Sequence, residues 1–327
     1  MMGLHRSLSL FVLVLCIVSC GGSRLGSGTG GDTGGLGPTF TATELDFPTK
    51  VLISVSDDGR TLGSGNAYIR DGVVTEVLPP TGTGTGLRYL TPDGSVAIGT
   101  YGRPYPYGNM LLAYSPEFRV VDFYKPERRM MQFRGLDPDG TVWISYGGVD
   151  PYPPGGFKWK HPGPEIPVTG DEMPPYVAFD GEAQLPEGYD ERRLFRASSN
   201  RQWAIGWARI RLEGGQTQED WFLWSASNPP ERLPEELGAA EQIDDTGKVV
   251  TGAEWVTPTE LEYRVWVRGH NVVTIAQALQ LAGVTVQTSN QLKVAGYSPN
   301  GRLLICTDPR FDHNLHFLLR VDPPGEP

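Results

Sequence analysis

A hairpin signature that recurs six times constrains the fold of this chain more than any other feature. In each copy an apolar residue precedes a short polar turn, often Asp-Gly or Asn-Gly, and a β-branched strand follows. Asp-Gly and Asn-Gly accept the positive φ of tight hairpin turns, so each copy predicts two antiparallel strands. The copies centre on Gly59, Gly94, Gly140, Asn200, Gly247 and Gly301.

Each hairpin is followed by a loop and an aromatic strand, such as Leu112-Ala113-Tyr114 or Gly156-Phe157-Lys158-Trp159. In the first five copies a further short apolar strand follows, such as Glu76-Val77-Leu78 or Val272-Val273-Thr274-Ile275. Four short strands in a meander make up one propeller blade. A chain with 42 Gly, 28 Pro and 10% aromatic residues is also typical of an all-β protein with many turns. The sequence therefore predicts an all-β fold, a single β-propeller of six blades.

The two ends of the repeat region complement each other. The sixth copy stops at Val321, before a fourth strand, whereas the segment from Phe40 to Phe47 resembles a fourth strand without a unit. We expect this N-terminal strand to pair into the last blade and close the ring. Closure removes the exposed edges that an open array of sheets leaves as aggregation sites.

Two further segments bear on the fold. Residues 161–194 fit no unit well and contain Asp180-Gly181, which leaves open an inserted hairpin or a seventh blade. Residues 275–282 predict a helix, because Ile275, Ala278, Leu279 and Ala282 share one face and Gly283 is a stop signal. We expect this helix to pack across the seam between the fifth and sixth units.

The N-terminus has the layout of an export signal. The apolar run from Leu8 to Val18, broken only by Ser9, is shorter than the ~20 residues of a membrane span and matches a signal-peptide core. It ends in Ile17-Val18-Ser19-Cys20, which resembles the lipobox of bacterial lipoproteins. The resemblance implies cleavage after residue 19 and a lipid on Cys20. The alternative is an ordinary secretory signal that leaves Cys20 as a spare thiol.

The lipobox resemblance also implies a location. A lipid on Cys20 would hold the protein at the membrane of the cell envelope. Gly21 is not acidic, which in this class of protein favours the outer membrane of a Gram-negative cell. Nine of the eighteen residues from Gly21 to Pro38 are glycine, so they should form a flexible tether of about 20–25 Å. The predicted organisation is a signal peptide (residues 1–19), a lipidated cysteine and tether (20–38), the repeat domain (39–322) and a disordered tail (323–327).

Charge and cysteine content restrict the partners and the chemistry. The formal net charge of −10 makes nucleic acid a poor partner. Once Cys16 is cleaved off and Cys20 is lipidated, Cys306 is the remaining cysteine and no intramolecular disulfide can form. Cys306 lies in a strand-like apolar run, which predicts a buried small hydrophobic residue.

We find no motif that predicts catalytic residues, a cofactor or a metal site. Asp137-Pro138-Asp139-Gly140 and Asp244-Asp245-Thr246-Gly247 could suggest calcium, but both lack the closing bidentate Glu and fall where the repeat predicts a turn. His313 and His316 form the closest histidine pair, without a third ligand in sight. Gly296-Tyr297-Ser298-Pro299-Asn300-Gly301 lacks the spacing of a nucleophile elbow, and no glycine-rich phosphate loop with its lysine is present.

Two aromatic, proline-rich loops are the best candidates for ligand recognition. One is Tyr101-Gly102-Arg103-Pro104-Tyr105-Pro106-Tyr107 and the other is Asp150-Pro151-Tyr152-Pro153-Pro154. Both should join the second and third strands of successive units and therefore emerge on the same face of the ring. Tyrosines held by prolines offer flat contact area at low entropic cost. The candidate ligand-binding residues are Tyr101, Tyr105, Tyr107 and Tyr152; alternatively these tyrosines pack on neighbouring blades.

Two stretches carry a resemblance to a known family. Residues 221–252 (WFLWSASNPPERLPEELGAAEQIDDTGKVVTG) and the segment from Ala278 to Ile305 resemble the HAF-type extracellular repeats of bacteria. The last copy departs from that pattern where Cys306 replaces a glycine. The resemblance implies a propeller-like fold and no agreed activity.

Together these features predict a membrane-tethered extracytoplasmic binding or scaffolding module, with an envelope protein or a glycan as its partner. One alternative is an envelope glycoside hydrolase or lyase on a propeller scaffold. The other is a structural surface protein without a discrete ligand.

Overall fold

The structure of the protein, a computed structural model, describes residues 37–47, 50–78, 83–104, 107–137, 139–148, 154–169, 172, 177, 179–286, 292–309 and 314–325. All of them belong to one compact unit, Gly35–Pro327. The predicted signal peptide, Cys20 and the tether up to residue 36 lie outside the described residues, as do Tyr105, Tyr152 and His313. No helix among the described residues is long and apolar enough to cross a membrane.

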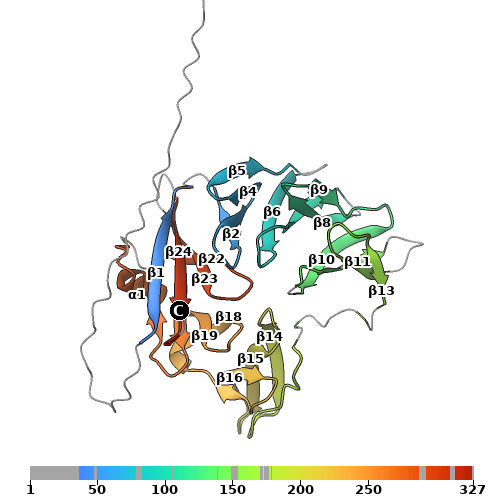
Figure 1. Ribbon diagram of the computed structural model, residues 1–327. Coiled ribbons are helices and arrows are strands. Elements are labelled where there is room, and N and C mark those ends of the chain that lie inside the picture. The colour runs from blue at the N-terminus through green and yellow to red at the C-terminus, as the bar shows by residue number, and fades with distance from the viewer. Residues whose placement is uncertain are drawn as a thin grey trace, which may run out of the picture. The chain divides into compact units, whose positions relative to one another are not determined.

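The described strands form six antiparallel sheets of four strands, which follow one another around a common centre (Figure 1). Blades 1 to 3 comprise β2 (Leu52–Val55), β3 (Thr61–Ser64), β4 (Ala67–Arg70) and β5 (Val73–Glu76); β6 (Thr83–Leu90), β7 (Ala97–Arg103), β8 (Gly108–Ser115) and β9 (Arg119–Asp122); β10 (Arg128–Leu136), β11 (Val142–Gly148), β12 (Gly155–Trp159) and β13 (Ile166–Val168). Blades 4 to 6 comprise β14 (Glu191–Ala197), β15 (Trp203–Arg211), β16 (Thr217–Ser225) and β17 (Glu231–Arg232); β18 (Ala239–Ile243), β19 (Val249–Thr257), β20 (Glu260–Val267) and β21 (Val273–Thr274); β22 (Lys293–Tyr297), β23 (Leu303–Pro309), β24 (Asn314–Asp322) and β1 (Thr39–Leu45). This arrangement is a six-bladed β-propeller and confirms the predicted fold class.

The N-terminal strand closes the ring, as the sequence predicted. β1 pairs with β24 over its whole length, from Thr39 opposite Asp322 to Leu45 opposite His316. Phe40 of β1 is buried among apolar residues of blade 6 and of helix α1 (Ile275–Leu281). The first and last strands of the repeat region therefore share one sheet.

The hairpin turns repeat in atomic detail. In blade 6 the Ser298 hydroxyl donates to Asn300 Oδ1 at 2.7 Å and accepts from the Leu303 amide at 3.0 Å, which ties the two ends of the turn together. Gly301 follows at φ 74°. In blade 4, where the signature is degenerate, Arg201 takes the glycine position at φ 61°. A left-handed arginine is uncommon, since its Cβ crowds the backbone there.

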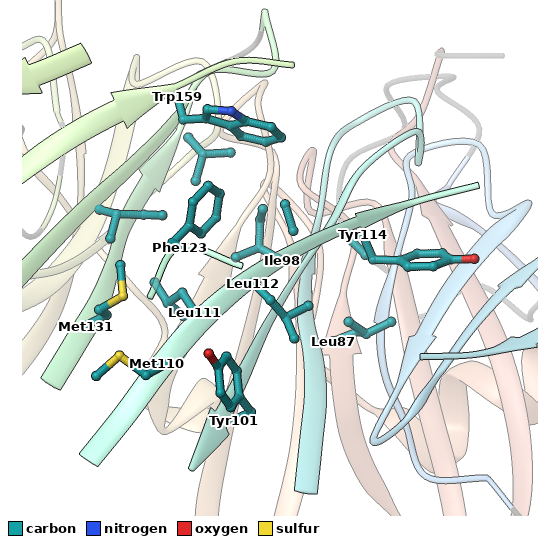
Figure 2. Packing of buried hydrophobic residues seen from close by; sticks show 14 of the residues in the cluster. Leu87, Ile98, Tyr101, Met110, Leu111, Leu112, Tyr114, Phe123, Met131 and Trp159 are labelled. Atoms are coloured by element: carbon teal, nitrogen blue, oxygen red, sulfur yellow. The ribbon is translucent and has the colours of Figure 1, made fainter. Parts of the chain in front are cut away.

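Most neighbouring blades are joined by apolar side chains between their sheets. One buried cluster runs through blades 1, 2 and 3 (Figure 2), and others join blades 4 and 5, blades 5 and 6, and blades 6 and 1. Helix α1 buries Ile275, Ala278 and Leu279 in the cluster of blades 5 and 6. The predicted helix and its place at that seam are therefore confirmed.

The contact between blades 3 and 4 differs from the others. Among the described residues no apolar cluster spans it. The described residues 179–190 form no strand and instead pack on blade 4, where Ala183 lies beside Trp224 and the Trp224 Nε1 donates to the Gln184 carbonyl oxygen at 2.8 Å. This stretch is therefore neither an inserted hairpin nor a seventh blade. An ion pair between Arg201 and Asp137 bridges the two blades.

Two predicted fourth strands end differently in the structure. In blade 1, β5 ends at Glu76, and Val77 is buried beyond its end. In blade 5, β21 ends at Thr274, because the Thr274 hydroxyl accepts from the Gln277 amide at 3.1 Å and the Gln277 side chain accepts from the Thr274 amide at 2.9 Å. This capping box starts α1 at Ile275, which was predicted as strand. A short 3-10 helix, η1 (Glu235–Leu237), precedes β18.

Candidate binding cavity

The innermost strands of the six blades surround an axial cavity of about 1040 Å³. Every blade contributes lining residues, so the cavity exists only in the closed ring. The residues that the argument below uses are Ile53 of β2, Arg88 and Tyr89 of β6, Phe133, Arg134 and Gly135 of β10, Phe195 and Arg196 of β14, Gln242 of β18, and Ala295 and Gly296 of β22.

A β-bulge at the same position of each innermost strand shapes this wall. In every blade the pairing between the first and second strands skips one residue of the first strand. A bulge adds one residue, bends the strand and redirects a side chain. Five of the six extra residues line the cavity, and Glu241 is the exception. The extra residues are Ile53, Arg88, Arg134, Phe195, Glu241 and Ala295.

In blades 4 and 5 a glycine opposite the bulge permits the close approach of the two strands. A Cβ on Gly206 would lie 2.1 Å from the Arg193 carbonyl oxygen, and a Cβ on Gly252 would lie 2.7 Å from the Leu237 carbonyl oxygen. Because backbone atoms occupy those positions, a side chain cannot be added without moving a strand. In blade 6 the equivalent residue is Cys306, which pairs with Val294 and is fully buried.

The charge of the lining is opposite to that of the chain. Arg88, Arg134 and Arg196 line the cavity, and none of them pairs with a carboxylate among the described residues. Arg134 Nε donates to the Ser145 hydroxyl at 2.8 Å, and Arg196 donates to Gln242 Oε1 at 2.6 Å.

A fourth lining arginine, Arg201, pairs with Asp137, the one carboxylate among the described lining residues. The other oxygen of Asp137 accepts from Trp143 Nε1 at 2.8 Å. The cavity is therefore basic although the chain carries a formal net charge of −10.

Aromatic rings lie beside the arginines. The rings of Tyr89 and Phe133 stack with centroids 3.9 Å apart and planes at 13°, and each ring belongs to the residue next to a lining arginine, Arg88 in blade 2 and Arg134 in blade 3. Phe195 precedes Arg196 and is 49% exposed. All three rings line the cavity; Tyr89 is 38% exposed, whereas Phe133 is partly buried and also packs against the apolar cluster of blades 1 to 3.

The tyrosines proposed as ligand contacts lie in different places. Tyr101 is not in a loop: it belongs to β7 and is buried in the cluster of Figure 2, and its hydroxyl donates to Asp122 Oδ1 at 2.5 Å. Burial raises its pKa, and the hydrogen bond to the Asp122 carboxylate raises it further. Tyr107 is half-buried and packs edge-on against Tyr124, whose ring also carries the Arg103 guanidinium 3.6 Å from its centroid. Tyr101 therefore packs in the apolar cluster of its blade and also contributes to the lining of the cavity, while Tyr105 and Tyr152 lie outside the described residues.

The Asp-rich segments form hairpin turns, and their carboxylates accept hydrogen bonds from donor groups of the protein. Asp244 is buried; its Oδ1 accepts from the Val249 amide at 2.9 Å and its Oδ2 from Arg302 Nε at 2.6 Å. Among the described residues no group of three or more His, Cys, Asp or Glu side chains could hold a metal ion. The turn interpretation accounts for both Asp137 and Asp244.

Other aspartates of these turns connect neighbouring blades. Asp57 of blade 1 accepts from the Asn300 amide of blade 6 at 2.8 Å, and Asp245 of blade 5 accepts from the Asn200 amide of blade 4 at 3.0 Å. Burial raises the pKa of Asp57 to about 6, against the lowering effect of the Asn300 hydrogen bond. The nearby charges of Asp245 and Asp58 add to the increase.

His316 and Cys306 are structural residues of blade 6. The buried His316 ring lies 2.8 Å from the Lys50 carbonyl oxygen through Nε2 and 2.9 Å from the Thr307 hydroxyl through Nδ1. Burial lowers the pKa of His316 and raises that of the Cys306 thiol. The thiol is thus a packing group, as the sequence predicted.

Sequence reasoning missed the cavity arginines, although a signal for their position exists. In every blade the extra residue of the bulge lies six positions before the positive-φ residue of the following turn. The pairs are Ile53 and Gly59, Arg88 and Gly94, Arg134 and Gly140, Phe195 and Arg201, Glu241 and Gly247, and Ala295 and Gly301. Counting back from each turn would therefore have located the wall of the cavity.

The ring and its axial cavity define the chain as a six-bladed β-propeller protein. No protein-family model matches the sequence, and no curated protein matches it either. Among solved structures it is similar to TolB from Acinetobacter baumannii (10% identity, 88% of this chain and 66% of that chain, TM-score 0.40). It is also similar to a putative TolB from Agrobacterium tumefaciens (14%, 88% and 99%, 0.37) and to the tricorn protease (12%, 83% and 26%, 0.42). Scores of this size assign no family, and the fold rests on the sheets described above.

Proposed function

We propose that this protein is a lipid-anchored, extracytoplasmic binding module that receives its ligand in the axial cavity of the propeller. The anchor and the envelope location rest on the sequence around Cys20, which lies outside the described residues. The kinship with HAF-type repeats is part of the same proposal and rests on the segment from Ala278 to Ile305 and on residues 221–252, which run from within β16 of blade 4 to within β19 of blade 5.

One observation carries the binding role: the cavity of about 1040 Å³ is lined from all six blades. Ligand sites are typically concave, with a few polar groups among apolar ones, and range from roughly 300 to 1,000 Å³. The hydrolase alternative would call for a pair of carboxylates flanking the scissile bond. The described lining offers Asp137 alone, and both of its oxygens are engaged.

The anchor is tested by metabolic labelling with an alkyne-bearing fatty acid. The full-length protein should acquire the label and sediment with membranes, because Cys20 would supply the acylated residue. Cys20→Ala should abolish labelling and release the protein into the soluble fraction, whereas Cys306→Ala should leave labelling unchanged. Labelling that persists in Cys20→Ala would contradict the proposed anchor.

The cavity is tested by blocking it. Ala295 is a small lining residue on β22, so Ala295→Trp should fill part of the cavity whatever the charge of the ligand. The immobilised full-length protein would be exposed to an envelope extract, and bound glycans and proteins identified by mass spectrometry. We expect one enriched species that Ala295→Trp no longer captures. Equal capture by both proteins would place the binding site elsewhere, and no enriched species would favour the structural alternative.

A further inference from the structure

The basic residues of the cavity are confined to one side of it. Arg88, Arg134 and Arg196 come from three consecutive blades, 2, 3 and 4. The lining from blades 6 and 1 is small or uncharged, with Ala295 and Ile53 as examples. Three positive charges along an arc match a ligand that carries several negative charges in sequence better than they match a single anion.

Among the described residues no carboxylate pairs with these arginines. Arg134 and Arg196 donate hydrogen bonds to neutral groups, and the one carboxylate of the described lining pairs with Arg201. Like charges along a concave wall repel each other, and such a wall focuses their field on an anion. Guanidinium groups bind carboxylates and phosphates through two parallel hydrogen bonds. The site is therefore built for an anion supplied from outside.

The aromatic residues add a second requirement. Tyr89 follows Arg88 in β6, Phe133 precedes Arg134 in β10, and the exposed Phe195 precedes Arg196 in β14; the first two rings stack on each other. Each of the three blades therefore contributes one arginine and one aromatic ring to the lining. The volume of about 1040 Å³ is at the upper end for small-molecule sites, which leaves room for several rings in a row.

Building on the proposed function, we propose that the cavity binds an acidic oligosaccharide with one carboxylate on each sugar ring. The carboxylates would pair with Arg88, Arg134 and Arg196, and the apolar faces of the rings would pack on Tyr89 and Phe195. Uncharged polar side chains of the lining would contact the hydroxyl groups; they include Thr100, Asn109, Ser199 and Gln242.

The test is calorimetric titration of the full-length protein with four tetramers: galacturonate, its neutral methyl ester, glutamate and thymidylate. We expect the galacturonate tetramer to bind at least about tenfold more tightly than the methyl ester, and to weaken as salt is raised. Arg134→Gln should weaken binding about tenfold and Arg134→Lys less, since lysine keeps the charge but not the paired hydrogen bonds. Arg119→Gln, an exposed position on the outermost strand β9, is the matched control and should leave affinity unchanged.

Each other outcome overturns a defined part of the proposal. The ligand class would be refuted if the glutamate or thymidylate tetramer bound more tightly than the galacturonate tetramer. It would also be refuted if none of the four tetramers bound. Equal binding of the galacturonate tetramer and its methyl ester would refute the role of the arginines. Capture of the natural ligand that is lost in Ala295→Trp but unaffected in Arg88→Gln and Arg134→Gln would leave the proposed function standing and refute only the charge. Melting temperatures of all variants verify that they fold.

Discussion

Truncation of Phe40 to alanine tests whether the N-terminal strand holds the ring closed. Phe40 is 9% exposed and packs on β24 and α1, in the cluster that contains Phe317 and Ile275. Truncating a buried Phe to Ala costs about 3–5 kcal/mol, and the lower figure applies here because β1 lies at the edge of its sheet. One kcal/mol shifts the melting temperature of a large domain by about 2–4 °C. Phe40→Ala should therefore melt roughly 6–12 °C below the wild type.

Differential scanning calorimetry of the full-length protein measures this shift. Thr43→Ala is the matched control, because Thr43 is exposed on the same strand and pairs with Leu318 through backbone groups that the substitution keeps. We expect a single transition in all three proteins, with the control within about 1 °C of the wild type. If Phe40→Ala melted at the wild-type temperature, β1 would not belong to the cooperative unit and the reasoning on ring closure would be refuted.

Three further predictions concern single residues. Gly206→Ala should lower the free energy of unfolding, measured by urea titration, by at least about 1–3 kcal/mol, because its Cβ would meet the Arg193 carbonyl oxygen at 2.1 Å. Gly135→Ala is the control and should be near neutral, because no atom lies within 4 Å of its Cβ. For Asp57, the raised pKa of about 6 means that the native state binds a proton more tightly than the unfolded state, so stability should fall as pH rises from about 4 to about 6. Asp57→Asn should flatten that fall and gain about 1 kcal/mol at pH 7 after solvent screening, and parallel pH profiles of the two proteins would contradict this. The buried Cys306 thiol, whose pKa is raised, should resist thiol reagents in the native protein and react once urea unfolds it; fast reaction without urea would be inconsistent with its burial.

The sequence predicted the architecture because its signals are local. A turn that needs positive φ selects Gly at positions such as Gly59 and Gly301, and this choice is visible without the structure. The closing strand was predictable because the sixth unit lacks a partner for β24 and Phe40 begins an unassigned apolar segment. Even Arg201, which breaks the glycine rule, was recognisable from its unit, since Ser198 and Asn200 tie that turn together as in the other blades.

The cavity was not predicted, because its residues come together only across blades. Arg88, Arg134 and Arg196 are far apart in the chain, and the overall acidic composition gives no indication that they form a basic site. The sequence instead indicated the aromatic loops as the ligand site, because Tyr101 precedes a run of prolines and further tyrosines. The hydroxyl of the buried Tyr101 bonds to the Asp122 side chain from another strand of the same blade, and no local sequence pattern predicts this contact.

Different residues of each unit specify the fold and the cavity. The turn, and in blades 4 and 5 the glycine opposite the bulge, are fixed by backbone geometry, since a Cβ on Gly252 or a lost positive φ at Gly247 would move a strand. The extra residue of the bulge is under no such constraint, because its side chain leaves the sheet for the cavity. The six extra residues accordingly vary in type (Ile, Phe, Glu, Ala and two Arg), whereas five of the six turns have Gly at the positive-φ position. The hairpin repeat therefore specifies the propeller, and five of the six positions that lie six residues before a turn form part of the cavity wall.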